Sequence, residues 1–160
     1  METKINIRIL LPGDYHKVFG LWTATAGMGI RSLDDSEAGI KKFLERNPNT
    51  CFLAEVSKSA EVSKIAEAAG TEVAGVILSG HDGRRGYIYH AVVKEEYRGK
   101  GIGGDLTKAV EQAMKKEGIN KLALVVYTNN KNGNGFWEHS GYITRPDLVY
   151  RNKSINSENN

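Results

Sequence analysis

A glycine-rich stretch, EEYRGKGIGGDL, occupies residues 95–106 and carries the clearest chemical signal in the sequence. Glycines at this density cost conformational entropy, so they indicate a sharp turn or a close backbone approach to a ligand. A helical pattern follows directly, and a helix N-terminus offers unpaired N–H groups and a positive dipole end. Since Arg98 and Lys100 add positive charge, the stretch predicts a phosphate or pyrophosphate site.

Three interpretations of this loop compete. A nucleotide-hydrolase P-loop ends in Gly-Lys-Ser/Thr, whereas this loop ends in Gly103, Gly104 and Asp105. A dinucleotide-binding fold places its glycines in the first β-α unit, with an acidic residue about 20 residues later. Here several predicted strands precede the loop, and the next strand ends at residues 127–130. A turn whose glycines serve packing alone is the third interpretation.

The elements that must position the loop follow from hydrophobic periodicity and turn residues. Asp82-Gly83 predicts a tight hairpin between two strands. The mixed order of elements predicts an α+β or α/β sheet with helices on its faces. Strands are expected at 4–10, 50–56, 72–81, 84–93 and 121–127, with a closing pair at 142–145 and 147–153, and helices at 12–25, 37–47, 105–118 and 132–141.

The chain of 160 residues is expected to form one domain over 1–152, with an insertion at about 57–71 and a polar, frayed tail at 153–160. A formal charge of +3, dispersed along the sequence, argues against nucleic acid as the main partner. The only cysteine is Cys51, so no disulfide framework, Cys-based metal site or other metal site is predicted. No apolar stretch suggests a membrane span or signal peptide, and the expected location is the cytoplasm.

Two motifs at matching spacing resemble those of the GNAT superfamily of acyl-CoA-dependent N-acyltransferases. They are Arg98, Gly101 and Gly103 in the loop, and Asn130, Trp137, Gly141 and Tyr142 after the next strand. The resemblance covers nearly the whole chain. It implies a mixed, mostly antiparallel central sheet of about seven strands, splayed between the fourth and fifth strands, with about four flanking helices.

The resemblance also implies acetyl-CoA as the acyl donor and a set of residues that hold it. The loop from Arg98 to Gly104 would bind the pyrophosphate, and the strand end before it would pair with the pantetheine arm as an added strand does. A backbone N–H near Val92 or Val93 would stabilise the oxyanion. The implied coenzyme A residues are Ala91, Val92, Val93, Arg98, Gly99, Lys100, Gly101, Ile102, Gly103, Gly104 and Asn130.

The sequence departs from the family where the acid and base are expected. The position of the common Tyr is Trp137, whose indole has no proton suited to the departing sulfur. The positions of the common Glu or His are Tyr89 and Tyr87, and a phenol with a pKa near 10 is a poor base. His90 adjoins the acyl-binding strand end, but strand alternation turns it to the opposite side unless a bulge intervenes.

The candidates for catalysis are therefore Tyr89, Tyr87 and His90, with catalysis by positioning alone as the alternative. For the acceptor, a loop at residues 27–35 forms a natural lid, in which Arg31 would meet a carboxylate and Asp34 and Asp35 a cationic amine. Capping of the following helix is the alternative role of the two aspartates. Arg84, in the hairpin, would grip an acidic group of the substrate.

The leading hypothesis is an N-acetyltransferase that transfers acetyl from acetyl-CoA to a primary amine of a small molecule or protein, directly in a ternary complex. An acyl-CoA-binding sensor or inactive partner protein is the alternative, because the usual Tyr and Glu are absent. Acetylation of aminoacyl-tRNA is a third idea that the small charge supports poorly. A homodimer is compatible with the sequence.

Overall fold

The computed structural model describes residues 4–57 and 70–160, so the insertion predicted at 57–71 lies almost entirely outside the described residues. Five strands form one sheet in the order β1-β2-β3-β4-β5. The first four pair antiparallel, and β5 joins β4 in parallel. Their bounds are Ile5–Ile9 (β1), Phe52–Ser57 (β2), Thr71–His81 (β3), Gly86–Val93 (β4) and Leu122–Ala123 (β5).

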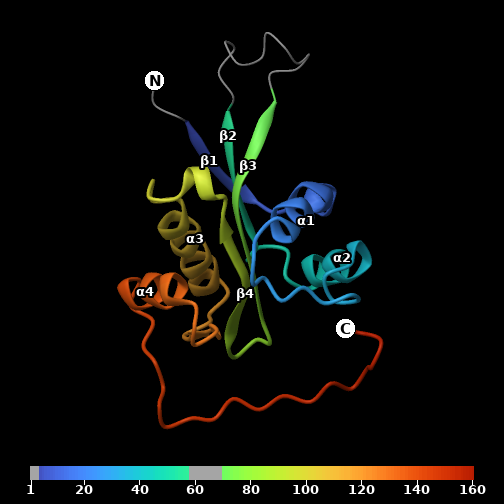
Figure 1. Ribbon diagram of the computed structural model, residues 1–160, viewed down its shortest axis with the longest axis vertical. Coiled ribbons are helices and arrows are strands. Elements are labelled where there is room, and N and C mark those ends of the chain that lie inside the picture. Colours follow the sequence, from blue (N-terminus) through green and yellow to red (C-terminus); the bar gives the residue numbers. More distant parts are fainter. Residues whose placement is uncertain (1–3, 58–69) are drawn as a thin grey trace.

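Helices cover both faces of this sheet (Figure 1). On one face lie α1 and α2, and on the other lies the longest helix, α3, with α4 beside it. Short 3-10 turns, η1 at Pro12–Asp14 and η3 at Glu95–Tyr97, lead into α1 and the glycine loop. The helices span Tyr15–Thr23 (α1), Glu37–Arg46 (α2), Ile102–Lys116 (α3) and Lys131–His139 (α4). The predicted mixed α/β architecture is confirmed.

Each face of the sheet has its own apolar core. Trp22 from α1 is fully buried against Leu53 and Val76 of the sheet. On the other face, Leu106 and Val110 of α3 pack with Ile77. Because successive strand residues face opposite sides, Val76 and Ile77 belong to different cores. The two layers hold β3 and β4 rigidly, and these strands carry the site described below.

A β-bulge interrupts the pairing of β3 with β4. Ile77 pairs with Ala91, whereas Ser79 pairs with Ile88, so Tyr89 and His90 together oppose Leu78. An extra residue of this kind places two consecutive side chains on one face. The pairing of β4 with β5 covers only Gly86–Leu122 and Tyr87–Ala123. Beyond these two pairs, the edge of β4 that faces β5 is open, as the predicted splay between the fourth and fifth strands requires.

The prediction of about seven strands is wrong for the described residues, which form five. Where a strand was predicted at 121–127, only Leu122–Ala123 pairs, and 142–145 and 147–153 form no strands. The apolar alternation there is real, but Ile143 and Val149 are exposed and no neighbouring strand completes a ladder. The segment after α4 instead passes around the end of the sheet toward α2 (Figure 1).

The C-terminal tail, predicted to be frayed, makes specific hydrogen bonds with the loop between α1 and α2. The Ser32 amide donates to the Asn160 carbonyl at 2.8 Å. Asn159 Oδ1 accepts from the amides of Leu33 and Asp34, each at 3.0 Å. Asn159 Nδ2 donates to the Asp34 carboxylate at 2.7 Å. The polar side chains that suggested disorder are therefore the groups that fix the tail.

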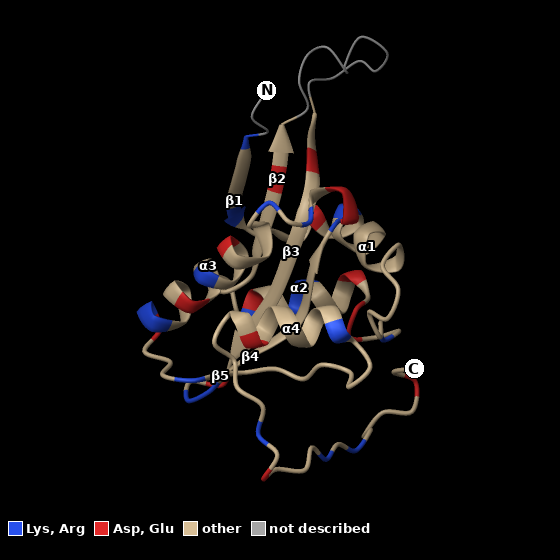
Figure 2. Cartoon of the chain, turned by 60° about the vertical axis from the view of Figure 1, so that its left-hand side comes forward, with Lys and Arg blue, Asp and Glu red and all other residues tan. Residues whose placement is uncertain are grey.

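Charged residues are interspersed over the molecule (Figure 2). Lysine, glutamate and aspartate alternate along α3, and both signs occur in the segment after α4. Within residues 4–57 and 70–160, no helix combines the length and apolar character that crossing a bilayer requires.

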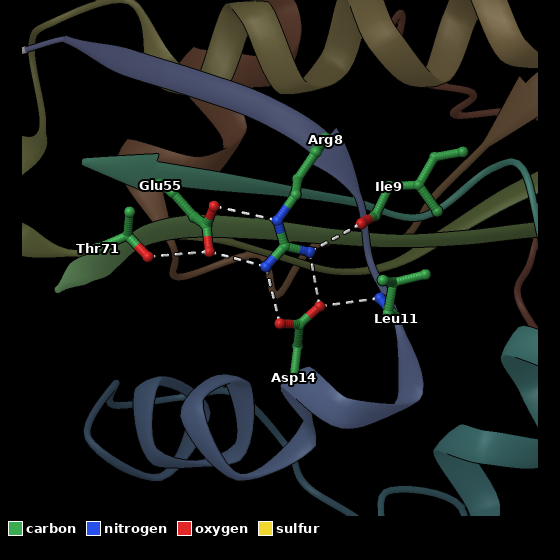
Figure 3. Close-up of polar contacts among 6 residues, drawn as sticks. All are labelled: Arg8, Ile9, Leu11, Asp14, Glu55 and Thr71. Carbon is green, nitrogen blue, oxygen red and sulfur yellow. Dashed lines mark hydrogen bonds and ion pairs between the residues drawn. The ribbon is translucent and has the colours of Figure 1, made fainter. Parts of the chain in front are cut away.

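An ion-pair cluster anchors α1 to the sheet (Figure 3). The guanidinium of Arg8 in β1 donates to both carboxylate oxygens of Asp14, at 2.7 and 2.8 Å. It also donates to both oxygens of Glu55 in β2, at 3.0 and 2.7 Å. Asp14 also accepts from the Leu11 amide at 3.0 Å. Arg8 holds the pKa of both carboxyl groups below their usual values, so they stay ionised and fix the start of α1.

Candidate active site

A cleft of about 1560 Å³ opens where β4, α3, α4 and the end of α1 meet. Its wall includes every predicted coenzyme A residue except Lys100. The lysine ammonium lies 5.2 Å from the centre of the Tyr97 ring instead. Other lining residues are Leu21, Ala24 and Met28 from α1 and the following loop, and Phe136, Trp137 and His139 from α4.

The glycine loop leads into α3 with a backbone conformation that only glycine adopts easily. Gly99 and Gly101 have φ values of 74° and 82°, in the left-handed region. Gly101 is the N-cap of α3, and no side chain caps that end. The first-turn N–H groups of this 15-residue helix therefore face the cleft with the positive end of its dipole.

The remaining two glycines of the loop, Gly103 and Gly104, differ in what surrounds them. A Cβ at Gly103 would lie 3.0 Å from the Phe136 ring, so this glycine allows α4 to approach α3. A Cβ at Gly104 would meet nothing within 4 Å, although Gly104 lines the cleft. The packing interpretation of the loop thus accounts for Gly103. The space beside Gly99, Gly101 and Gly104 is open, because a Cβ at any of the three would meet nothing within 4 Å.

The open edge of β4 continues the same wall. The Lys94 amide donates to the Ala74 carbonyl of β3 at 2.8 Å. Because backbone groups alternate between the two edges of a strand, those of Ala91 and Val93 point to the open side. Arg98 Nε donates to the Val93 carbonyl at 3.0 Å and holds its guanidinium beside the strand end. Ala91 and the Val93 N–H are thus placed to pair with an extended amide-bearing chain.

Asn130 lies across the cleft and begins α4. Its Oδ1 accepts from the Gly133 amide at 2.9 Å, so the side chain caps the helix. A Cβ at Gly133 would lie 2.5 Å from Asn130 Nδ2, and this close approach explains the glycine. The Nδ2 group has no hydrogen-bond partner among the described residues, and it remains able to donate to a ligand in the cleft.

An acidic and basic cluster flanks the loop at the end of β4. The Lys94 ammonium pairs with Glu72 and lies 2.7 Å from Glu96. Tyr97 donates to Glu72 at 3.3 Å. All four side chains line the cleft. These pairs fix the turn that leads from β4 into the glycine loop.

An aromatic cluster covers the α2 face of β4. The rings of Tyr87 and Tyr89 lie 4.8 Å apart, and Phe43 of α2 meets Tyr89 edge-on at 5.5 Å. Burial raises the pKa of both tyrosines above 10, and Tyr150 of the C-terminal segment adds to the effect. Asp34 also raises the pKa of Tyr89. Both phenols therefore hold their protons at neutral pH, although Tyr89 remains 56% exposed.

Strand alternation predicted that His90 would face away from Tyr89 unless a bulge intervened. The bulge is present, and it places both side chains on the same face. His90 packs edge-on against Trp22, with ring centroids 4.9 Å apart. Its Nε2 lies 2.7 Å from Asp35 Oδ1, and the side chains are 14% and 6% exposed. Sequence reasoning missed Asp35 as a partner, because 55 residues separate the pair and only the fold joins them.

The predicted acceptor residues are not all brought together. Asp34 lies at the surface beside Asn159 and close enough to affect Tyr89. Arg31 belongs to the same loop, and its amide donates to Asp35 Oδ2 at 2.6 Å. Arg84 lies in the β3-β4 hairpin, where its amide donates to Asp82 Oδ1 at 2.7 Å. That hairpin is at the opposite end of β4 from Val93 and does not line the cleft.

The loop between α1 and α2 also reaches toward the residues after β5. Gly29 has a φ of 63°, and a Cβ there would lie 3.3 Å from the Tyr127 hydroxyl.

On α4, Trp137 packs between Phe136 and Tyr142 at centroid distances of 4.9 and 5.0 Å. Burial raises the pKa of Tyr142, which donates to Glu111 at 3.2 Å.

Comparison with known proteins gives a family match over this same region. The family model described as "Acetyltransferase (GNAT) family" matches residues 27–142. A protein of Yersinia pestis named acetyltransferase is 28% identical over 151 residues, which cover 94% of this chain and 96% of the relative.

Solved structures share the fold at low sequence identity. A ribosomal-protein-alanine N-acetyltransferase of Brucella melitensis has a TM-score of 0.62 and 16% identity, covering 94% of this chain and all of that one. AAC(6')-Iy, in complex with the bisubstrate analogue CoA-S-monomethyl-acetylneamine, has a TM-score of 0.65 and 14% identity, covering 95% and 99%. One fold thus appears in proteins whose names indicate quite different acceptors.

Proposed function

The chain belongs to the acetyltransferase (GNAT) family, and from this we propose that it is an N-acetyltransferase that uses acetyl-CoA. It would transfer the acetyl group directly to a primary amine, of a small molecule or a protein, with both substrates bound together. One observation carries the proposal: the uncapped N-terminus of α3 and the open edge of β4 line a single cleft.

The donor fits that cleft group by group. The first-turn amides of α3 and the guanidinium of Arg98 would hold the pyrophosphate, because both offer N–H donors and positive potential. The backbone N–H and carbonyl of Ala91 would pair with the amides of the pantetheine arm, and Asn130 Nδ2 would donate to the same arm. Bound in this way, the donor supplies an acetyl thioester beside the bulge of β4.

The Val93 amide is the proposed oxyanion donor, since it points to the open edge whereas Val92 faces β3. An N–H fixed by the sheet needs no rearrangement as negative charge develops on the acetyl oxygen. Tyr87 and Tyr89 are protonated at neutral pH, so they are suited to donate a proton to the leaving sulfur and not to accept one from the amine.

The acceptor would approach from the α1-α2 loop and the tyrosine face of β4. Asp34 would attract a cationic amine there, and Arg31 would meet a carboxylate of the acceptor. Arg84, at the far hairpin, would contact only an acceptor long enough to reach from the cleft along β4. An acceptor-free acyl-CoA sensor is the second candidate, favoured by Trp137 in place of the common tyrosine.

Two measurements separate these candidates. Calorimetry with coenzyme A tests donor binding, and free-thiol release with acetyl-CoA across a panel of amines tests turnover. The proposed function predicts both saturable binding and amine-dependent thiol release. Binding without thiol release for any small amine or peptide N-terminus would favour the sensor. Absence of binding would refute both.

A further inference from the structure

The largely enclosed pair of His90 and Asp35 has no role in donor binding and does not itself line the cleft, but His90 directly precedes Ala91, which does. We infer that His90 is the base that deprotonates the amine and that Asp35 is its positioning residue. This inference rests on the proposed function and assigns the proton acceptor that the two tyrosines cannot provide.

The bulge of β4 is the feature that makes this role geometrically available. If β4 alternated regularly through Tyr89 and His90, His90 would face α3, opposite to Tyr89. With the bulge, the imidazole lies on the α1 face, immediately before Ala91, whose backbone lines the cleft. Leu21 of α1 and Met28 of the following loop line the same cleft on either side of Trp22 in sequence.

Asp35 is held so that its carboxylate points to His90. The Tyr15 hydroxyl donates to the Asp35 carbonyl at 2.9 Å, and the Arg31 amide donates to Oδ2 at 2.6 Å. Oδ1 is left for His90 Nε2. A carboxylate only accepts, so Nε2 carries the proton and the neutral imidazole has its lone pair on Nδ1.

The surroundings favour charge on His90 during the reaction. A buried carboxylate is costly unless it is paired, and no lysine or arginine side chain bonds Asp35 within residues 4–57 and 70–160. Tyr15 and Arg31 bond Asp35, the latter through its backbone amide, and Tyr89 precedes His90 on β4. Since no hydrogen bond or ion pair joins the Arg31 guanidinium to Asp35 in the described part of the chain, an imidazolium at His90 would be the natural counter-ion of Asp35.

Two polar atoms at this position have no hydrogen-bond partner among the described residues. One is Nε1 of the fully buried Trp22. The other is His90 Nδ1, because the hydrogen bond of this side chain is made by Nε2. The rings that carry them meet edge-on at 4.9 Å. Polar atoms of this kind are suited to a water that relays a proton between the amine and Nδ1.

The proton and electron balance is simple. The ammonium acceptor gives one proton to Nδ1 through water, and the nitrogen lone pair forms the N–C bond to the acetyl carbon. The C–S bond breaks with its electron pair on sulfur. The nitrogen loses its second proton as the amide forms, and one proton is taken up by the thiolate. The first proton, held on His90, passes to solvent.

Variants of both residues test the inference through the pH dependence of kcat/KM for the amine. His90→Gln should lower this rate constant about 100-fold near neutral pH, since a general base contributes that much or more. The reduction in kcat/KM should be smaller at high pH, where the free amine is abundant. Asp35→Asn keeps an acceptor for Arg31 but removes the charge, so it should move the acid limb of the profile to lower pH.

His81→Gln is the matched control. His81 is also partly buried, with Nε2 3.9 Å from the Glu117 carboxylate, but it is the last residue of β3, beside the hairpin. Its profile and rate should equal those of the wild type. Coenzyme A binding within twofold of wild type for every variant would show that the donor site is intact.

A second readout does not depend on turnover. Long-range ¹H–¹⁵N NMR should show neutral His90 protonated at Nε2 in the wild type, and a mixture of tautomers in Asp35→Asn. The inference is overturned if His90→Gln acts within twofold of wild type, or if Asp35→Asn leaves both tautomer and profile unchanged. Should the wild type release no thiol with any amine, the proposed function itself fails, and a fixed Nε2 tautomer would then be purely structural.

Discussion

Two regions at the end of β4 offer different groups to a ligand. Along the cleft, residues from Ala91 to Gly104 other than Lys100 combine an open strand edge and a helix N-terminus with charged and aromatic side chains. Outside the residues that line the cleft, Tyr87 and Tyr89 cover the face of β4 toward α2, near the loop between α1 and α2 and the C-terminal segment. Under the proposed function the first region would be the donor side, held largely by fixed backbone groups, and the second the acceptor side, whose side chains can vary without altering the fold.

The largest effect is expected from filling the donor side. Gly104→Val adds a side chain where the structure has open space, so folding should be preserved while the pyrophosphate is displaced. Coenzyme A affinity should fall about 100-fold, or roughly 2.7 kcal/mol, by calorimetry. Gly135→Val, in α4 and equally free of contacts, is the control and should bind normally. Equal binding by both variants would contradict the phosphate site.

The second effect concerns the scaffold of the acceptor side. Asp14→Ala leaves Arg8 with one carboxylate and should lower the free energy of unfolding by about 2 kcal/mol, less than for a fully buried pair because Arg8 is 30% exposed. Urea unfolding of the wild type and of Asp14→Ala measures this difference in the free energy of unfolding. Coenzyme A binding to the folded variant should change little, since β4 and α3 are untouched.

The same cluster predicts a pH dependence. Arg8 lowers the pKa of Asp14 and Glu55, so their stabilisation is complete above the ordinary carboxyl pKa near 4 and is lost as pH falls through the lowered values. Wild-type stability should therefore drop below about pH 4, and Asp14→Ala should drop less steeply. Parallel curves for the two proteins would show that the cluster contributes nothing to acid sensitivity.

The third prediction compares the two cations of the glycine loop, Arg98 and Lys100, in their effect on coenzyme A binding. Arg98→Gln removes the guanidinium that β4 holds at the cleft and should weaken coenzyme A binding by about tenfold, within the range of a charge-assisted hydrogen bond. Lys100→Gln should cost roughly threefold or less, mostly at low salt, because its ammonium lies over Tyr97. The reverse order would place the pyrophosphate differently along the loop.

The smallest effect on catalysis is expected at the tyrosines of the acceptor face. Tyr87→Phe and Tyr89→Phe keep the aromatic packing and remove only the hydroxyls, so kcat should fall by about fivefold at most if the thiolate leaves without help. Steady-state kinetics with a single amine would measure it. A loss approaching 100-fold in either variant would make that phenol the acid of the reaction.

Sequence reasoning succeeded where a local rule decides the structure. Gly99 and Gly101 have the left-handed backbone that their residue type suggests, and the helix predicted at 105–118 forms, although it starts earlier, at Ile102 with Gly101 as its N-cap. The strands that form β1 to β4 follow from their apolar patterns, because both faces of the sheet are buried. These features need only nearby residues to be read correctly.

It failed where pairing between distant segments decides. Ile143 and Val149 have the pattern of strand residues, but a strand exists only if another lies beside it. The link between Asp35 and His90 depends on the fold of α1 and α2 over β4. Sequence reasoning could state the condition for His90, a bulge, but the register that creates the bulge is set by both neighbouring strands.

The bulge also decides how many side chains β4 presents to α1 and α2. Deleting one residue at 89 or 90 would restore regular pairing with β3 and leave Ala91 to Val93 in their present register and on their present faces. One side chain would then stand where Tyr89 and His90 now lie side by side. Between relatives of this chain, such a deletion should keep the cleft wall but lose either the contact of Tyr89 with Phe43 or the pair of His90 with Asp35.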